Sequence, residues 1–260
     1  MLFRSGGVPA DQGWVDLLVA KGYTVDLNFR AQQGRTLDDT KIAALNAADL
    51  IIVSRDTDSG QYDDGSEPAQ WNGITTPILL QVPHIARSSH WRWLNTTGIT
   101  NNLPAANPLV AVDPSHPIFN GVTLVANQVS VLTLVSDFAS ITDPGNGKLI
   151  ARRADNSQVW IVFWEPGQRF YPTASYADLT PAIAGGPRMF FASGSDEGTD
   201  GRYNLTTGGE KLFLNAVDYM INWKQVKATN PAPGNGSLVD ATTVALTWKA
   251  GGLAALHDVY

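Results

Sequence analysis

Polar and aromatic side chains follow several predicted strands of this chain. Strands are expected at residues 50–53, 77–82, 159–163 and 188–191, and each is followed by residues that could do chemistry. These residues are Arg55, Asp56, His84, Trp164, Glu165, Ser195, Asp196 and Glu197. In an open α/β sheet, ligands bind outside the carboxyl ends of the strands. We therefore expect these side chains to converge on one site.

Acid–base chemistry is the reaction type that these residues favour. His84 or Glu197 would be the general base, and Arg55 would stabilise the negative charge that develops during the reaction. Glu165 would add a further carboxylate. The alternative interpretation is that polar residues here only terminate strands and cap helices.

Tryptophans near this edge could bind a ligand. Trp91 and Trp93 lie in a polar stretch, where exposed indole rings would stack on sugars. Trp164 would form an apolar wall of the site, and Ser195 would supply a hydrogen bond. The alternative is that Trp91 and Trp93 pack beneath a β-rich region, because large aromatic residues are mostly buried.

An acidic stretch has the spacing of a calcium loop. Carboxylates fall at positions 1, 3, 9 and 12 of a 12-residue window, namely Asp56, Asp58, Asp64 and Glu67. Gln61 replaces the glycine of position 6, and no helical pattern precedes the window, which argues against a true EF-hand. We expect a looser Ca²⁺ site that uses Asp56, Asp58 or Asp64, with Asp196 in a second acidic loop. A solvated loop is the alternative.

Composition excludes several other kinds of site. The 260 residues include no Cys and only four His, so thiolate chemistry is impossible and zinc binding is not expected. A net charge of -6 without a basic cluster argues against nucleic acid as a partner, and no apolar run is long enough to span a membrane. The glycine pair at 6–7 does not complete a nucleotide-binding motif, so neither a nucleotide nor a flavin is expected.

A serine nucleophile is a further alternative. Ser88 or Ser89 lies near the turn after the strand at 77–82, with His84 or His90 close in sequence. Gly-x-Ser-x-Gly, the pattern of the nucleophile elbow, is absent, which argues against this alternative.

The pattern of hydrophobic residues predicts an α/β fold. Strands at 2–4, 23–29, 50–53 and 77–82 alternate with helices at 11–21 and 37–48, which favours a mostly parallel sheet flanked by helices. An inserted antiparallel region runs from about 95 to 172, with a hairpin of strands 148–152 and 159–163. A closing helix follows, in which Thr207 and Glu210 have capping-box spacing.

A stretch rich in Pro, Gly and Asn near the end of the chain predicts a domain boundary. We expect an α/β domain over residues 1–226, a linker over 227–238 and a fragment of a β-sandwich over 239–260. The sequence shows no signal peptide and does not predict the oligomeric state.

The order of these elements resembles the class I glutamine amidotransferase-like superfamily, and its ThuA-like branch in particular. The resemblance lies in the glycine turn at 6–7, the segment 115–121, and the strand that ends at 193–195 before the last helix. Segments 69–74 and 87–93 are similar to a secreted bacterial subgroup, and residues 230–260 resemble the start of a fibronectin-III-like module. The resemblance implies a flavodoxin-like core in an extracytoplasmic protein longer than this chain.

The chain differs from that superfamily in its catalytic residues. Amidotransferases use a Cys nucleophile, and this chain has none, so hydrolysis of glutamine is excluded. We favour a hydrolase of a small ester, lactone or glycoside, assisted by Ca²⁺. The alternative is a non-catalytic carbohydrate-binding or adhesion module of a larger secreted bacterial protein.

Overall fold

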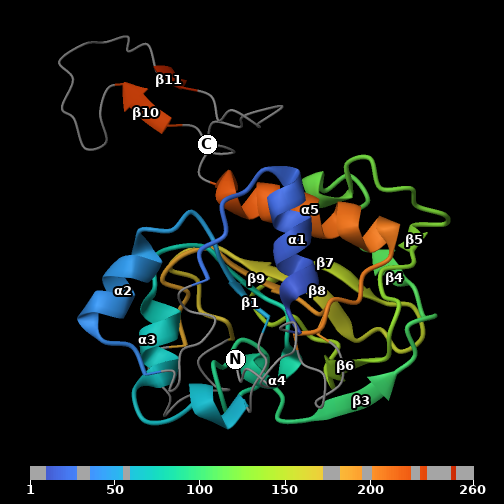
Figure 1. Cartoon of the computed structure of the whole chain (residues 1–260), viewed down its shortest axis with the longest axis horizontal. Coiled ribbons are helices and arrows are strands. Elements are labelled where there is room, and N and C mark those ends of the chain that lie inside the picture. The colour runs from blue at the N-terminus through green and yellow to red at the C-terminus, as the bar shows by residue number, and fades with distance from the viewer. Residues whose placement is uncertain are drawn as a thin grey trace, which may run out of the picture.

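The structure is a computed structural model that describes residues 10–27, 36–54, 59–171, 182–194, 201–223, 229–232 and 247–249 (Figure 1). The α-helices are α1 Gln12–Lys21, α2 Asp39–Asn46, α3 Glu67–Gly73, α4 Pro83–Ala86 and α5 Thr207–Ile221, and the 3₁₀ helices are η1 Ser59–Tyr62 and η2 Pro117–Phe119. The strands are β1 Ile51–Val53, β2 Ile78–Leu80, β3 Ile99–Leu103, β4 Leu109–Ala111, β5 Gln128–Val129, β6 Ser136–Ala139, β7 Lys148–Arg153, β8 Val159–Trp164, β9 Arg188–Phe191, β10 Thr229–Ala232 and β11 Thr247–Lys249.

A mixed seven-stranded sheet forms the centre of the molecule, in the order β1-β2-β9-β8-β7-β4-β5. Strands β1, β2 and β9 are parallel to one another, and β8, β7, β4 and β5 continue the sheet in antiparallel pairings. Every residue of β2, β8 and β9 is buried, in agreement with their continuously apolar sequences. The predicted α/β class is confirmed. Among the described strands, parallel pairing is confined to β1, β2 and β9.

The predicted antiparallel region is present. The expected hairpin is formed by β7 and β8, where Leu149 pairs with Val162. Most of the region extends the main sheet, while β3 and β6 form a separate two-stranded sheet. The direction of β8 matters for the site, because its last residue, Trp164, pairs with the first residue of β9, Arg188.

Two helices pack together over the sheet. Helix α1 ends at Gly22, which takes φ = 101° and so accommodates the left-handed turn after the helix. Its Trp14 packs against Phe213 of α5, with ring centroids 4.8 Å apart, and Figure 1 shows the two helices crossing. The apolar face of α5 is buried: Leu212, Phe213, Ala216, Val217 and Met220.

The cap of α5 differs from the prediction by one residue. Thr206 precedes the helix in an extended conformation, and its hydroxyl accepts a hydrogen bond from the backbone N–H of Gly209. Thr207 is instead the first helical residue. Glu210 contacts the hydroxyl of Tyr203, so the predicted capping box of Thr207 and Glu210 does not form.

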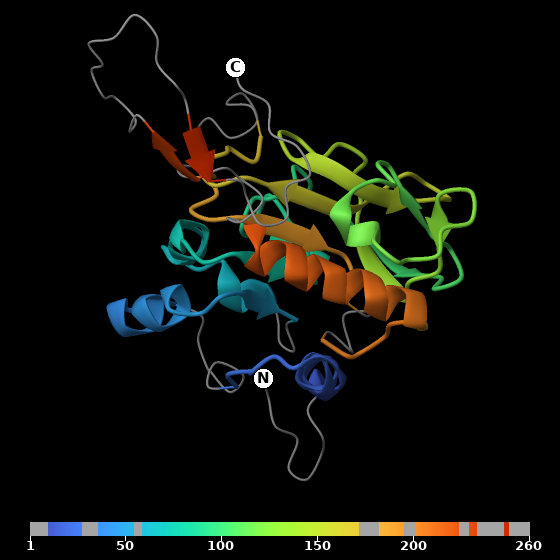
Figure 2. The same cartoon turned by 90° about the horizontal axis from the view of Figure 1, so that it is seen from above.

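Some sequence predictions concern segments at the two ends of the chain. Residues 23–27 form no strand within the part that the structure describes, and the expected strand at 2–4 lies outside the described residues. Near the other end, β10 lies inside the predicted linker and pairs with β11 as a separate two-stranded sheet (Figure 2). Within the predicted linker, Thr229–Ala232 is thus a strand, and the domain boundary stays a prediction. No helix in the described ranges has the length and apolar character needed to cross a membrane.

Candidate functional site

A buried histidine and a buried aspartate lie together beyond the carboxyl end of β2. His84 sits on the short helix α4, which begins three residues after Leu80, the last residue of β2. Its Nε2 is 3.6 Å from Oδ2 of Asp137, on β6, and Figure 1 shows α4 beside β6. Only 5% of His84 and 1% of Asp137 is exposed. A carboxylate beside an imidazole stabilises the imidazolium that forms when the histidine accepts a proton.

Asp137 is also held by the backbone. Its Oδ1 accepts a hydrogen bond of 2.9 Å from the N–H of Asn102. Asn102 has φ = 55°, a left-handed conformation that few residues other than glycine adopt, although asparagine tolerates it. The backbone turn at Asn102 thus supports the carboxylate that faces His84.

Arg87 connects His84 to a second polar group. Its Nε donates a 2.8 Å hydrogen bond to the carbonyl oxygen of His84, and its Nη2 donates one of 3.0 Å to the hydroxyl of Ser59. The same Nη2 lies 3.2 Å from Nε2 of His90. His90 Nε2 is also 3.3 Å from Oδ2 of Asp63, and its Nδ1 is 2.9 Å from the hydroxyl of Ser89. Arg87 therefore contacts the backbone of His84 and the ring of His90.

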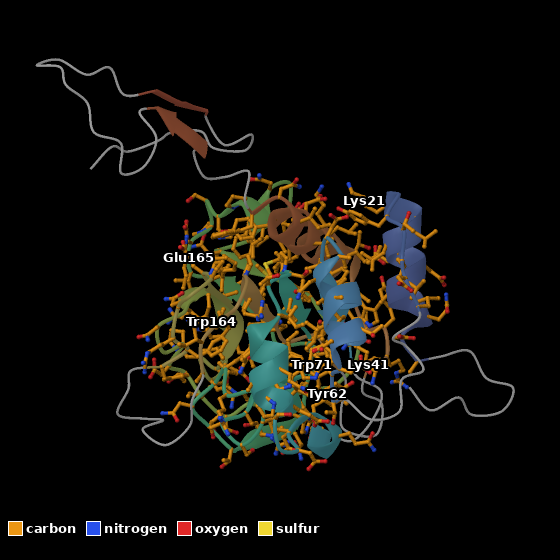
Figure 3. All side chains as sticks on the ribbon, turned by 90° about the vertical axis from the view of Figure 1, so that its left-hand side faces the viewer. Lys21, Lys41, Tyr62, Trp71, Trp164 and Glu165 are labelled. Carbon is orange, nitrogen blue, oxygen red and sulfur yellow. The ribbon has the colours of Figure 1, made fainter. Side chains whose placement is uncertain are left out.

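Glu165 and Trp164 are not part of this site. Because β8 runs antiparallel to β9, Trp164 pairs with Arg188, which also pairs with Ile78 at the start of β2. Glu165 follows Trp164 and is exposed at that opposite edge (Figure 3). Burial, with a further contribution from the charge of Glu165, raises the pKa of Tyr219 in α5 to about 12. The prediction that Glu165 and Trp164 converge with His84 is wrong, because it assumed that all four strands were parallel.

The tryptophans are buried and do not form a binding surface. Trp91, Trp93 and Trp164 each have 0% exposure. Trp91 stacks on Trp71 with ring centroids 5.0 Å apart, and Trp93 stacks on Phe170 at 5.6 Å. The interpretation of Trp91 and Trp93 as exposed rings for sugars is therefore wrong. The alternative, packing beneath the β-rich region, is confirmed for Trp93, which contacts Trp164 and Phe170.

In the part of the acidic stretch that the structure describes, residues 59–67, the last carboxylate of the window faces the protein interior. Glu67 begins α3, is 3% exposed, and accepts hydrogen bonds from the hydroxyl of Thr36 and the backbone N–H of Asp64. It is therefore turned inward instead of toward an ion. Asp64 is exposed. Within the ranges that the structure describes, no three His, Asp or Glu residues are placed to hold a metal ion.

Several predicted site residues lie outside the described residues, so the structure does not place them. They are Arg55, Asp56, Asp58, Ser195, Asp196 and Glu197. The sequence predictions missed Asp137 and the role of Arg87. A single aspartate in β6, a strand whose four residues are all buried, is a signal that could have identified Asp137, since unpaired carboxylates are almost never buried.

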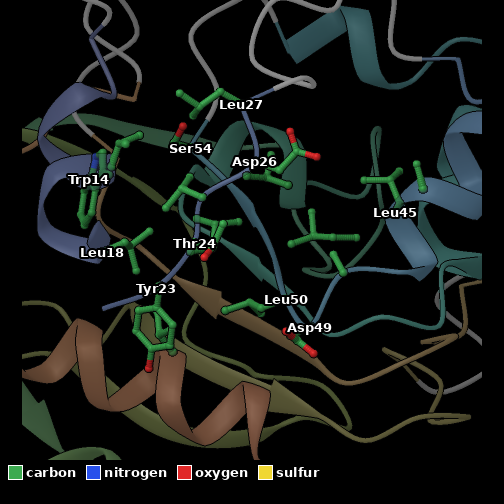
Figure 4. Close-up of a pocket in the computed structure, with 18 of the residues that line it drawn as sticks. Trp14, Leu18, Tyr23, Thr24, Asp26, Leu27, Leu45, Asp49, Leu50 and Ser54 are labelled. Atoms are coloured by element: carbon green, nitrogen blue, oxygen red, sulfur yellow. The ribbon is translucent and has the colours of Figure 1, made fainter. Parts of the chain in front are cut away.

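A cavity of about 690 Å³ lies at a different place, between α1, residues 23–27, α2 and β1 (Figure 4). Leu18, Leu45 and Leu50 line it, together with the polar side chains of Asp26 and Ser54. Neither His84 nor Glu165 is among the lining residues. The cavity and the His84–Asp137 pair are therefore separate features.

No family model and no curated protein matches the chain. Among solved structures, the cytoplasmic protein STM3548 from Salmonella typhimurium is similar, with 14% sequence identity and a TM-score of 0.47. The alignment covers 79% of this chain and 84% of that chain. This similarity says nothing about activity, so the chemistry has to be argued from the residues of this chain.

Proposed function

We propose that the chain is a hydrolase of a small ester, lactone or glycoside in which His84 acts as general base. The observation that carries this proposal is the buried contact between His84 Nε2 and Asp137 Oδ2 at 3.6 Å. It lies beyond the carboxyl end of a parallel strand, where α/β proteins bind their substrates.

The pair supplies a base in a defined tautomer. With Nε2 facing the carboxylate of Asp137, the proton of the neutral imidazole stays on Nε2. His84 then takes the proton of the attacking water, and Asp137 stabilises the imidazolium that results. Asp137 is a positioning residue, because it acts on the substrate only through His84.

The remaining parts of the proposal rest on residues outside the described ranges. Arg55 would stabilise the developing negative charge, Glu197 would add a second carboxylate, and Ser195 would bind the substrate. Ca²⁺ would be held by Asp56, Asp58 and Asp196, with Asp64 at the exposed side. The flavodoxin-like arrangement proposed for the core is supported by the three parallel strands β1, β2 and β9.

The proposed setting is an extracytoplasmic protein whose later residues start a fibronectin-III-like module. The antiparallel pairing of β10 with β11 supports a β-rich module after the α/β domain. Secretion of the full-length protein, followed by cell fractionation, tests the proposed location.

A substrate screen with matched variants tests the hydrolase proposal. Ester, lactone and glycoside substrates are offered to the wild type and to His84→Gln, Asp137→Asn and Glu197→Ala. We expect kcat/KM to fall by about 10²–10⁴-fold in His84→Gln, the usual contribution of a general base, while the circular dichroism spectrum is unchanged. His116→Asn is the control, because His116 is also buried but lies outside the site.

Two outcomes would overturn the proposal. One is turnover that is the same in His84→Gln as in the wild type. The other is binding of a polysaccharide without turnover of any substrate, which would favour the non-catalytic carbohydrate-binding alternative. If kcat/KM of Asp137→Asn equals that of the wild type while His84→Gln is inactive, only the positioning role of Asp137 is contradicted.

A further inference from the structure

The second histidine–carboxylate pair, His90 and Asp63, contacts the hydroxyl of Ser89, so that the three groups lie in a row. The hydroxyl of Ser89 is 2.9 Å from Nδ1 of His90, and Nε2 of His90 is 3.3 Å from Oδ2 of Asp63. A hydroxyl, an imidazole and a carboxylate in this order form the arrangement that activates a serine nucleophile. Here the ring nitrogens are used in the order Nδ1 to serine and Nε2 to carboxylate.

The serine of this row is exposed and the histidine behind it is buried. Ser89 is exposed, so an electrophile in solution can reach its hydroxyl. His90 is only 6% exposed, and the side chain of Asp63 is 24% exposed. The imidazole is therefore largely shielded from water, and its interaction with the carboxylate is stronger than it would be between two exposed groups.

The turn that bears Ser89 and His90 is fixed on both sides. His90 donates its backbone N–H to the carbonyl oxygen of Arg87 at 3.0 Å, and the next residue, the fully buried Trp91, donates to Ile85 at 3.0 Å. Arg92 closes the turn with φ = 64°, an outlier for a residue with a long side chain. Strained backbone of this kind gathers at functional sites, where the surrounding packing holds it.

Asp63 favours the tautomer that the reaction needs, and Arg87 opposes it. The Nη2 of Arg87 lies 3.2 Å from Nε2 of His90, but a guanidinium only donates hydrogen bonds, so Arg87 and Asp63 favour opposite tautomers. For Nδ1 to accept the proton of Ser89, the proton of the neutral ring has to be on Nε2, facing Asp63. The negative charge of Asp63 also offsets the positive charge of Arg87 beside the imidazolium that forms.

We propose that Ser89 is a nucleophile that attacks unhindered esters of small carboxylic acids, with His90 as its base and Asp63 as the positioning residue. The Oγ of Ser89 forms a bond to the carbonyl carbon while its proton passes to Nδ1 of His90. The bond from that carbon to the alkoxide breaks, and the alkoxide leaves as an alcohol with the proton from His90. Water, deprotonated by His90, then attacks the acyl carbon. The bond from that carbon to Oγ breaks, His90 returns the proton to Oγ, and the carboxylic acid leaves.

This centre is distinct from the His84–Asp137 pair and does not rest on it. The sequence lacks the glycines of a nucleophile elbow, so a serine here would be activated on a turn after α4 instead. The exposed position of Ser89 leaves room for an unhindered ester to approach from solvent.

Covalent labelling with an alkyl fluorophosphonate tests the proposal without a substrate. The serine oxygen displaces fluoride from phosphorus, and the adduct is located by intact-mass and peptide mass spectrometry. We expect one adduct per chain, on Ser89, and none in Ser89→Ala. Labelling should slow at least 100-fold in His90→Gln, which removes the base. It should slow about 10-fold in Asp63→Asn, which removes the charge of the carboxylate that positions the base.

Three controls keep the result specific. Ser88→Ala changes the neighbouring hydroxyl and should label at the wild-type rate. His116→Asn should also label at the wild-type rate, because His116 is a buried histidine outside this centre. Circular dichroism checks that each variant is folded. Absence of an adduct on Ser89 of the wild type in excess probe would overturn the proposal, as would equal labelling rates in the wild type and a folded His90→Gln.

Discussion

The guanidinium of Arg188, on β9, donates a 2.9 Å hydrogen bond to the carbonyl oxygen of Asn72 in the last turn of α3. The same group also donates to the carbonyl oxygens of Thr76, Ile74 and Trp71, and it is fully buried. A cation at the end of a helix interacts favourably with the helix dipole and satisfies carbonyls that have no partner within the helix. Arg188 therefore fixes α3 to the sheet.

Replacing Arg188 should destabilise the protein strongly. Arg188→Met leaves several buried carbonyl oxygens without a donor, and each unsatisfied buried group costs about 1–3 kcal/mol. We expect the free energy of unfolding, measured with urea, to fall by about 3 kcal/mol. Arg152→Met is the control, because Arg152 is exposed on β7. Equal stabilities of the two variants would contradict the anchoring role.

Two glycines near the same junction should respond in opposite ways to alanine. A Cβ on Gly186 would lie 2.1 Å from the carbonyl oxygen of Thr75, whereas one on Gly73 would meet nothing within 4 Å. Because backbone has to move in the first case, we expect Gly186→Ala to lower the free energy of unfolding by about 3 kcal/mol. Gly73→Ala, at the end of α3, should raise it by up to about 1 kcal/mol. Urea unfolding of both variants checks this, and a neutral Gly186→Ala would argue against the close approach.

His116 should make stability depend on pH. Burial, and then the positive charge of Lys148, lower the pKa of His116 to about 4. Between the ordinary pKa of 6.5 and about 4, the unfolded chain binds a proton that the folded chain does not, so stability falls as the pH is lowered through this range. The loss is at most about 3 kcal/mol for this group, at 1.36 kcal/mol per pKa unit.

A variant isolates this contribution. The Nδ1 of His116 accepts a hydrogen bond from the N–H of Ile118 as the cap of η2, and an asparagine oxygen can replace it. His116→Asn should therefore show a smaller loss of stability than the wild type between pH 7 and pH 4, whatever its stability at pH 7. Parallel curves for the two proteins would contradict the assignment to His116.

Calcium binding by Asp56, Asp58, Asp64 and Asp196 predicts a higher midpoint of thermal unfolding with Ca²⁺ than with a chelator. A ligand that binds only the folded state stabilises it by about 2.7 kcal/mol at 100 times its Kd. Asp58→Asn should reduce the shift, and Asp39→Asn, an exposed change on α2, should leave it unchanged. Identical midpoints with Ca²⁺ and with chelator would remove calcium from the proposed function.

Local sequence patterns predicted the elements whose formation depends on near neighbours. Gly22 ends α1 because a left-handed turn is needed there, and the hairpin of β7 and β8 follows from the turn residues between two apolar runs. The apolar face of α5 was predictable for the same reason. Each of these depends on contacts within one element or between adjacent elements.

The candidate site was predicted only in part, because its geometry depends on pairings between distant segments. His84 was identified from its place after β2, but its partner Asp137 comes from β6, far along the chain. Glu165 was misplaced because the direction of β8 is set by its pairing with β9. The burial of Trp93 likewise depends on Phe170, whose position no local pattern reveals.

The buried tryptophans bear on how the protein can be observed. Trp71, Trp91, Trp93 and Trp164 form a continuous series of ring contacts, with centroids 5.0 to 5.8 Å apart. At these separations, excitation energy passes readily from one indole to the next, so their ultraviolet emission behaves as a collective signal. A change in that emission will report opening of the packed interior between α3 and β8, and a ligand at the surface near Ser89 will need a probe of its own.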